Sequence, residues 1–200
     1  MRFALTFALG LGLLTVGGPL AAQEFRGVAL GAPIPETAPE PTGSEVAPPF
    51  GYTLWQFDDG LSMSATRDAE TGVVLYLEMW RTQSAGTAET PLPGLTFGAT
   101  TRGDLAEIFG SEGIVFENRG RFVEVGPMAV FFISYEVAGS DRVVSFVTIQ
   151  PLSEASEETA DASVLDAVIV ADGRYLDQIW GGNRGRLDGY TPIADPFGAD

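Results

Sequence analysis

The sequence predicts an α+β fold that consists mostly of antiparallel β-sheet, with one or two short helices. Short segments rich in Val, Ile, Phe and Tyr alternate with turns that contain Asp and Gly, which is typical of hairpins. Two such segments near the middle of the chain are long enough to form an extended hairpin. Only one segment carries both a clear start signal and a clear stop signal for a helix.

Residues 1–22 have the pattern of an export signal that is cleaved after Ala22. A positive start at Arg2 precedes an uncharged apolar run, and small residues stand directly before Gln23. The alternative is an uncleaved anchor, because residues 3–22 contain no charge. The unbroken apolar core covers only about 14 residues, fewer than the roughly 20 of a membrane span, which favours cleavage. We therefore expect a periplasmic or secreted protein with no stable membrane insertion after cleavage.

Residues 23–50 are predicted to form a proline-rich extended segment that precedes one domain at residues 51–200. The prolines lie between residues 32 and 49. Proline removes a backbone donor and restricts the residue before it, so helix and central strand are both disfavoured there. We expect an extended linker or a loop that wraps on the surface.

The domain is predicted to begin with a three-stranded meander. Residues 52–57 are rich in aromatic side chains, residues 61–65 alternate apolar with polar, and residues 73–80 are again apolar and aromatic. Turn signals separate these strands, at Asp58-Asp59-Gly60 and at residues 68–72.

Residues 101–110 are the best helix candidate. Thr101 and Asp104 resemble a capping box, and an apolar face follows them. Gly110 stands where a glycine commonly ends a helix. We expect a brief helix between these signals.

The remainder of the domain is predicted to be mostly strand. Strands at residues 114–117 and 122–125 flank a turn at residues 118–120, and residues 128–137 and 142–149 form a long hairpin. Two connections complete this part, residues 82–93 and the acidic residues 152–163.

A second hairpin is predicted at residues 164–180, followed by an irregular tail from Gly181. Residues 164–170 are apolar and β-branched, and Asp172-Gly173 is a strong signal for a two-residue hairpin turn. A helix through this region is the alternative, which Gly173 disfavours.

Two pairs of similar segments suggest that the domain arose by duplication, with halves at residues 27–80 and 94–150. The matching segments are residues 27–31 with 94–98, and residues 73–77 with 143–147. Because the chain contains 25 glycines, a chance match of the two Gly-x-x-x-Gly segments is the alternative.

Residues 94–100, followed by Asp104-Leu105 and Phe109-Gly110, resemble the opening of small envelope α+β modules of the SmpA/OmlA and β-lactamase-inhibitor-protein-like kinds. The resemblance covers residues 94–150 and implies short helices that lead into an antiparallel sheet. Such modules typically bind other proteins, so the resemblance implies a binding role. The first half departs from the pattern, because proline-rich sequence stands where a helix would be.

The chain contains no His, Cys or Lys, and all 11 basic side chains are Arg. These absences exclude Ser-His-Asp triads, Cys-His and Ser-Lys dyads, Schiff-base lysines and zinc sites of Cys and His. They also exclude disulfides, so stability must come from an ordinary core. The net charge of −16 disfavours nucleic acid as a partner and is also a common solubility device.

Aromatic side chains on strands provide the predicted binding residues. Period-2 alternation places Glu78 on the same strand face as Tyr76 and Trp80, which makes it the most suggestive acid in the chain. A surface of this kind could stack sugars or dock a protein, although strand aromatics are more often part of a core. The wider aromatic set comprises Trp55, Trp180, Tyr52 and Tyr135.

Other charged groups suggest alternative chemistry. Paired carboxylates drawn from Glu78, Glu124 and Glu136 could act on glycosidic bonds, whereas outward-facing strand positions explain the same acids without catalysis. Asp68 and Glu70 have part of the spacing of a calcium loop, but Asp and Gly also suit an ordinary hairpin turn.

The only basic cluster, residues 181–186, could bind an anion through arginine and backbone donors. Pairing of its arginines with acids of the same chain is the alternative, because the chain is strongly acidic.

The function expected from these features is that of an exported, non-enzymatic interaction or binding module. Its partner would be another envelope protein, and no cofactor is expected. The alternatives are a carboxylate-dependent enzyme that acts on envelope glycans and a weak calcium-binding structural protein.

Overall fold

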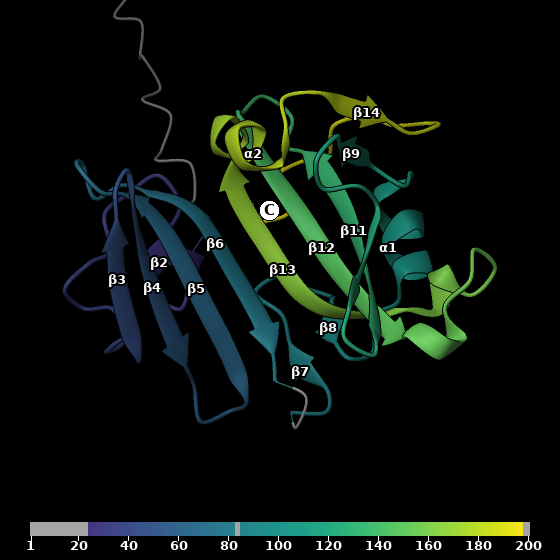
Figure 1. Ribbon diagram of the computed structural model, residues 1–200, viewed down its shortest axis with the longest axis horizontal. Helices are drawn as coiled ribbons and strands as arrows, with labels where there is room; N and C mark the ends of the chain where they lie inside the picture. Colours follow the sequence, from purple (N-terminus) through teal and green to yellow (C-terminus); the bar gives the residue numbers. More distant parts are fainter. Residues whose placement is uncertain (1–23, 83–84, 198–200) are drawn as a thin grey trace, which may run out of the picture.

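The computed structural model describes residues 24–82 and 85–197, and its main feature is one large antiparallel sheet (Figure 1). Ten strands form this sheet in the order β14-β9-β11-β12-β13-β6-β5-β4-β3, with β10 also pairing with β11. The strands are β3 (Gly43–Ala47), β4 (Phe50–Gln56), β5 (Leu61–Asp68), β6 (Val74–Arg81), β9 (Ile114–Phe116), β10 (Phe122–Val125), β11 (Met128–Glu136), β12 (Arg142–Pro151), β13 (Val164–Asp172) and β14 (Arg184–Arg186). The predicted fold class, α+β with a dominant antiparallel sheet, is confirmed.

Most of the predicted strands are present. The meander is β4-β5-β6, and the long hairpin is β11-β12. The strands predicted on either side of residues 118–120 are β9 and β10, but each pairs with β11 and they do not pair with each other. The acidic connection contains two short 3₁₀ turns, Leu152–Glu154 and Ala160–Ala162.

The two meanders β4-β5-β6 and β11-β12-β13 meet at an antiparallel ladder between β6 and β13. Each inner strand carries one extra residue opposite its neighbour, Leu75 in β6 and Asp166 in β13. An extra residue of this kind is a β-bulge, which bends the strand and redirects a side chain. The bulges lie at corresponding places in the two meanders.

One face of the sheet, here called the α1 face, carries the larger core. It is covered by α1, by the C-terminal tail and by two short hairpins, and Phe25, Phe97 and Leu105 are completely buried against it. The covering elements are β1 (Glu24–Phe25) with β2 (Val28–Ala29), β7 (Ala88–Glu89) with β8 (Thr96–Phe97), and α1 (Arg102–Phe109).

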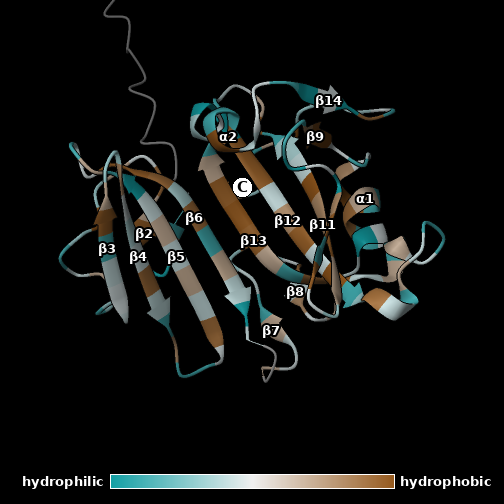
Figure 2. Cartoon of the chain, in the orientation of Figure 1, coloured by the Kyte–Doolittle hydropathy of each residue, from teal (hydrophilic) through white to brown (hydrophobic). Residues whose placement is uncertain are grey.

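The opposite face, the α2 face, carries a second core beneath α2 (Gly173–Trp180). In Figure 1, α2 lies across one end of β12 and β13. Ile169 and Val143 are buried there, and most of both strands is hydrophobic in Figure 2 because their side chains pack on both faces. The residues of β5 on this face, Ser62, Ser64 and Thr66, are more polar.

The predicted helix at residues 101–110 is confirmed as α1. The Thr101 side chain accepts a hydrogen bond from the Asp104 backbone N–H, and the Asp104 carboxylate accepts one from the Thr101 N–H, so the capping box is complete. Gly110 ends the helix with a φ of 72°, in the left-handed region that glycine adopts without strain.

The predicted hairpin at residues 164–180 is wrong in its second arm. The first arm is β13, but residues 173–180 form α2. Asp172 starts this helix, because its carboxylate accepts hydrogen bonds from the backbone N–H groups of Arg174 and Tyr175. A Cβ at Gly173 would lie 2.6 Å from the carbonyl oxygen of Asp141, so glycine permits a close approach of chains here and does not form a hairpin turn.

The proline-rich segment is a wrapped loop and part of the domain, so no domain boundary falls at residue 51. Phe25 and Val28 are fully buried in the core of the α1 face. The indole Nε1 of Trp55 donates a hydrogen bond of 2.8 Å to the carbonyl oxygen of Pro39. The segment also supplies β3, which forms an edge of the sheet, where proline is tolerated.

The C-terminal tail is more ordered than predicted. It supplies β14, and Ile193 is buried beside β11, with a backbone hydrogen bond of 3.0 Å from its N–H to the Glu136 carbonyl oxygen. Phe197 packs against Phe25, so the two described ends of the chain meet. The predicted export signal at residues 1–22 lies outside the described residues. Within the described residues, no helix has the length and apolar character to cross a membrane.

Candidate functional site

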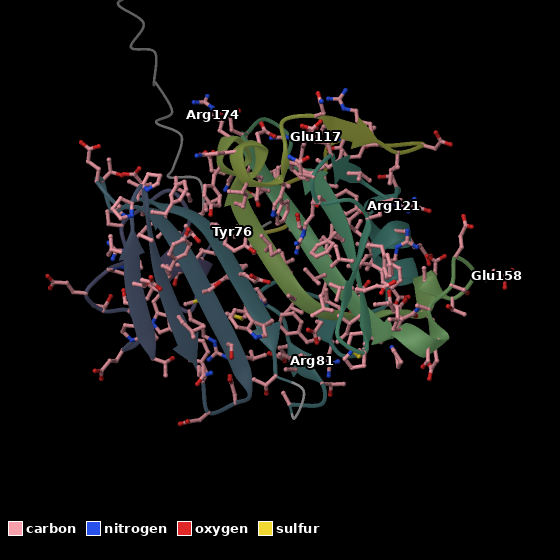
Figure 3. The ribbon with its side chains drawn as sticks, viewed as in Figure 1. Tyr76, Arg81, Glu117, Arg121, Glu158 and Arg174 are labelled. Atoms are coloured by element: carbon pink, nitrogen blue, oxygen red, sulfur yellow. The ribbon has the colours of Figure 1, made fainter. Side chains whose placement is uncertain are left out.

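Tyr76, Glu78 and Trp80 stand in a row on the α2 face of β6, as period-2 alternation predicts; we call these three residues the β6 ridge. Figure 3 labels Tyr76, the first residue of the ridge. Each of the three is partly exposed. Their cross-strand neighbours are mostly small, and none carries a charge. These neighbours are Thr66, Ser64 and Ser62 on β5, and Ala171, Ile169 and Ala167 on β13. Because these neighbours are small, the longer side chains of β6 project beyond those of β5 and β13 on the same face.

Glu78 is the central residue of the ridge. The phenol of Tyr76 donates a hydrogen bond of 2.8 Å to Oε2 of Glu78. Burial among apolar groups raises the pKa of Glu78 above its ordinary value, and the nearby Asp166 charge adds to this, while the Tyr76 hydroxyl and the Arg119 charge oppose it. Burial also raises the pKa of Tyr76, so this phenol stays a hydrogen-bond donor at neutral pH.

Arg119 approaches the ridge from the loop between β9 and β10. Its guanidinium carbon lies 3.8 Å from the ring centre of Phe132 and 5.3 Å from that of Trp180, which are cation–π contacts. The Nε atom of Arg119 is buried without a hydrogen-bond partner. Burial lowers the pKa of Arg119, and the charges of Tyr76 and Glu78 act against that shift, so the three groups interact electrostatically.

The loop that carries Arg119 is fixed by backbone hydrogen bonds. The N–H of Asn118 donates to the carbonyl oxygen of Trp180 at the end of α2, and the N–H of Gly120 donates to that of Phe116, each at 2.9 Å. The sequence placed Arg119 in a turn and gave no sign of a role. Its position over the α2 face depends on how this loop docks on α2, which no local pattern reveals.

Asp166, the extra residue of the β13 bulge, is the second acid near the ridge. Its carboxylate lies 3.0 Å from Nε of Arg81, as an ion pair. Burial raises the pKa of Asp166, and the charge of Arg81 opposes the shift. Asp166 is therefore neutralised within the chain.

Of the other predicted aromatic residues, Tyr52 alone is exposed on the same face as the ridge. Trp55 is 1 % exposed and lies on the α1 face, as does the buried Tyr135. Trp180 is 8 % exposed and packs edge-on against Phe116 and Phe132 in the core beneath α2. Tyr52 shares the α2 face with the ridge and is exposed on β4.

Asp68 serves as a turn residue. Its Oδ1 atom accepts hydrogen bonds from the backbone N–H groups of Glu70 and Thr71 and from the Thr71 hydroxyl. These bonds lower the pKa of Asp68. Among residues 24–82 and 85–197, no group of three or more acidic side chains is arranged to hold a metal ion.

The basic cluster at residues 181–186 is engaged within the chain. Arg184 forms ion pairs with Asp177 at 2.8 Å and with Glu136 at 2.9 Å. Glu136 is therefore half of a structural pair, and Glu124 is an exposed residue of β10. The intramolecular pairing weighed as the alternative is what the structure contains.

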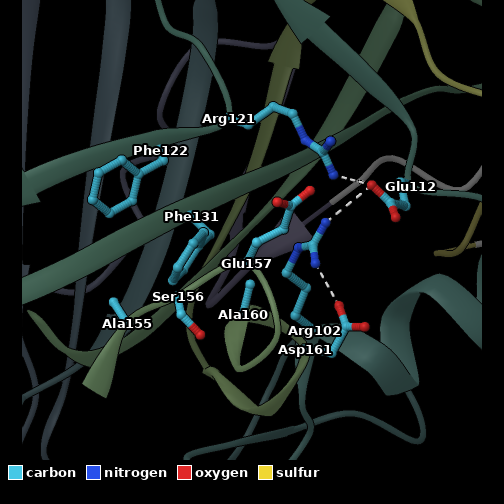
Figure 4. A pocket seen from close by; sticks show the side chains of 10 residues that line it. All are labelled: Arg102, Glu112, Arg121, Phe122, Phe131, Ala155, Ser156, Glu157, Ala160 and Asp161. Carbon is cyan, nitrogen blue, oxygen red and sulfur yellow. Dashed lines mark hydrogen bonds and ion pairs between the residues drawn. The ribbon is translucent and has the colours of Figure 1, made fainter.

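A cavity of about 460 Å³ lies beside α1, at the outer edge of the sheet (Figure 4). Phe122 and Phe131 line one side of it. On the other side, Glu112 pairs with both Arg102 and Arg121, and Arg102 also pairs with Asp161. Both arginines are satisfied by carboxylates of the same chain, so the ion pairs of this cavity hold α1 to its surroundings and leave neither arginine free for a ligand.

No protein-family model, curated protein or solved structure matches the chain. The site is therefore interpreted from its own geometry.

Proposed function

We propose that this protein is an exported binding module of the periplasm that recognises another envelope protein through the β6 ridge. The observation that supports this most is the partial exposure of Tyr76, Glu78 and Trp80 on the α2 face of the sheet. Aromatic side chains combine a large contact area with few rotatable bonds, which is why they dominate protein-binding surfaces.

The distribution of charge also suits a binding role. Eight of the ten described arginines form ion pairs within the chain, and this leaves an acidic surface with few free cations. Such a surface discourages association with nucleic acid and anionic lipid, and it favours partners that carry basic patches. The resemblance of residues 94–150 to small envelope modules agrees with this role.

Affinity capture with matched variants tests the proposal. The immobilised mature protein should retain a partner from an extract of exported proteins of its own source, and Trp80→Ala should reduce that retention at least tenfold, because the ridge loses its largest contact. Val46→Ala, an exposed change on the opposite face, should leave retention unchanged. Thermal unfolding of each variant must first show that the fold persists.

The proposal is overturned if the wild-type protein retains nothing, or if Trp80→Ala retains the partner as well as Val46→Ala does. Trp80→Phe provides a second variant that keeps an aromatic ring, and it should restore much of the retention.

A further inference from the structure

We infer that the β6 ridge binds a cationic side chain, an arginine or lysine of the partner protein, with Glu78 as the ion-pairing group. This inference rests on the proposed function and names the chemistry of the partner at the same site. Its basis is the unusual position of Glu78 among the carboxylates of the chain.

Glu78 is a desolvated acid without an ion-pair partner. Among the described residues, burial raises the pKa of two carboxyl groups, Glu78 and Asp166. Asp166 is paired with Arg81, whereas no arginine nitrogen of the described residues lies within 4.0 Å of Glu78. Removing a carboxylate from water without a compensating charge is costly, so such groups are commonly found where a ligand supplies that charge.

Glu78 keeps unused hydrogen-bonding capacity. A carboxylate offers about four lone-pair sites, and the Tyr76 phenol occupies one of them, on Oε2. An arginine side chain could therefore donate to the remaining sites without displacing Tyr76. Its planar fork of donors matches a carboxylate well.

Aromatic rings lie on both sides of this carboxylate. Tyr76 and Trp80 are each two positions from Glu78 on the same strand, a separation of roughly 7 Å along β6. A cation held by Glu78 would therefore lie between two aromatic side chains, and cation–π attraction to either ring would add to the ion pair. The overall charge of −16 would also speed the approach of a basic partner.

Arg119 restricts which cations the β6 ridge can bind. It is the positive group nearest the ridge that has no carboxylate partner, and its Nε atom lacks a hydrogen-bond acceptor. Arg119 repels any cation, but a peptide arginine also brings carbonyl oxygens that Arg119 can bind, which offsets the repulsion. The site therefore favours a cationic residue within a polypeptide over an inorganic cation.

Arginine amide and its neutral isostere citrulline amide provide a direct test. NMR titration of the Glu78 side-chain carboxyl in the full mature protein should show arginine amide binding at millimolar concentration. Citrulline amide should bind at least tenfold more weakly, because it lacks the charge. Glu78→Gln should lose the preference for arginine amide over citrulline amide. Glu45→Gln removes an exposed charge from β3 on the same face, and it should retain that preference.

The pH dependence provides a second readout. Binding of arginine amide should weaken as pH falls through the raised pKa of Glu78, because a protonated carboxyl cannot form the ion pair. The charged and titratable groups that face Glu78 are Tyr76, Asp166 and Arg119. Of these, only Asp166 is another carboxyl group with a raised pKa, and Asp166→Asn should leave the pH dependence in place.

The inference is overturned if the wild type binds the two amides equally or binds neither. It is also overturned if Glu78→Gln binds arginine amide as well as the wild type does. These outcomes remain distinct from a failure of the proposed function. If partner capture still depends on Trp80 while arginine preference is absent, the ridge binds a protein by other contacts.

Discussion

At the scale of single residues, Glu78 combines a cost to stability with a benefit to binding. The folded protein holds the Glu78 proton at a higher pH than the unfolded chain does, because burial raises its pKa. Between the two pKa values the folded state binds more protons, so rising pH removes stability through that window. Above the window the ionised carboxylate destabilises the fold.

Glu78→Gln should therefore be more stable than the wild type at pH 7, by about 1.4 kcal/mol for each unit of the upward pKa shift. The advantage should disappear below about pH 4, where Glu78 is protonated in both states. Urea unfolding at pH 3 and pH 7 measures the difference. If Glu78→Gln and the wild type have the same free energy of unfolding at both pH values, the Glu78 carboxylate is solvated.

The residues of the site differ in how far the sequence predicts them. Alternation along a strand is enough to place Tyr76, Glu78 and Trp80 on one face, so the β6 ridge was predictable. Trp55 was assigned to the same surface by residue type alone, and the strand that carries it turns that side chain into the core. Arg119 reaches the ridge only through the docking of a loop on α2, which is a tertiary contact without a local signal.

At the scale of elements, Asp172-Gly173 shows why one dipeptide can start two structures. Asp followed by Gly is the strongest short signal for a hairpin turn, and Asp is also a preferred residue before a helix. The outcome is decided by the residues that follow: Tyr175, Leu176 and Trp180 bury one side of a helix against the sheet. The turn signal was correctly located, but the contacts that select the helix are tertiary.

Asp172→Ala should destabilise the protein by about 1 kcal/mol, because two backbone N–H groups at the start of α2 lose their acceptor. Asp172→Asn keeps an acceptor oxygen and should cost only a few tenths of a kcal/mol. Chemical denaturation of the two variants measures the difference. Equal losses in both variants would point to the charge of Asp172 as the stabilising feature.

At the scale of the whole molecule, the predicted duplication can be compared with the positions of the two bulges. Gly31 and Gly98 occupy matching positions in the two Gly-x-x-x-Gly segments. The N–H of Gly31 donates a hydrogen bond to the carbonyl oxygen of Val74, and that of Gly98 to the carbonyl oxygen of Leu165; each acceptor is the residue before a bulge. The second sequence match, residues 73–77 with 143–147, makes β6 equivalent to β12. The positions of the bulges make β6 equivalent to β13 instead. Duplication therefore stays a prediction.

The burial of its first hairpin explains why the N-terminal segment packs with the rest of the domain. The hairpin β1-β2 lies on the α1 face as β7-β8 does, and each hairpin buries a phenylalanine completely, Phe25 and Phe97. Proline content disfavoured helix and central strand in the segment that follows, but it carried no information about burial. The core contacts of this segment come from apolar residues scattered between the prolines.

Phe25→Ala should therefore destabilise the whole domain by about 3 kcal/mol or more, because it opens a cavity in the main core and removes the contact with Phe197. Val46→Ala lies in the same segment at a position that is 56 % exposed, and it should change stability by less than about 0.5 kcal/mol. Urea unfolding followed by tryptophan fluorescence measures both variants in one cooperative transition. If Phe25→Ala unfolds at the same urea concentration as the wild type, residues 24–50 form an independent segment, and the core of the α1 face is complete without them.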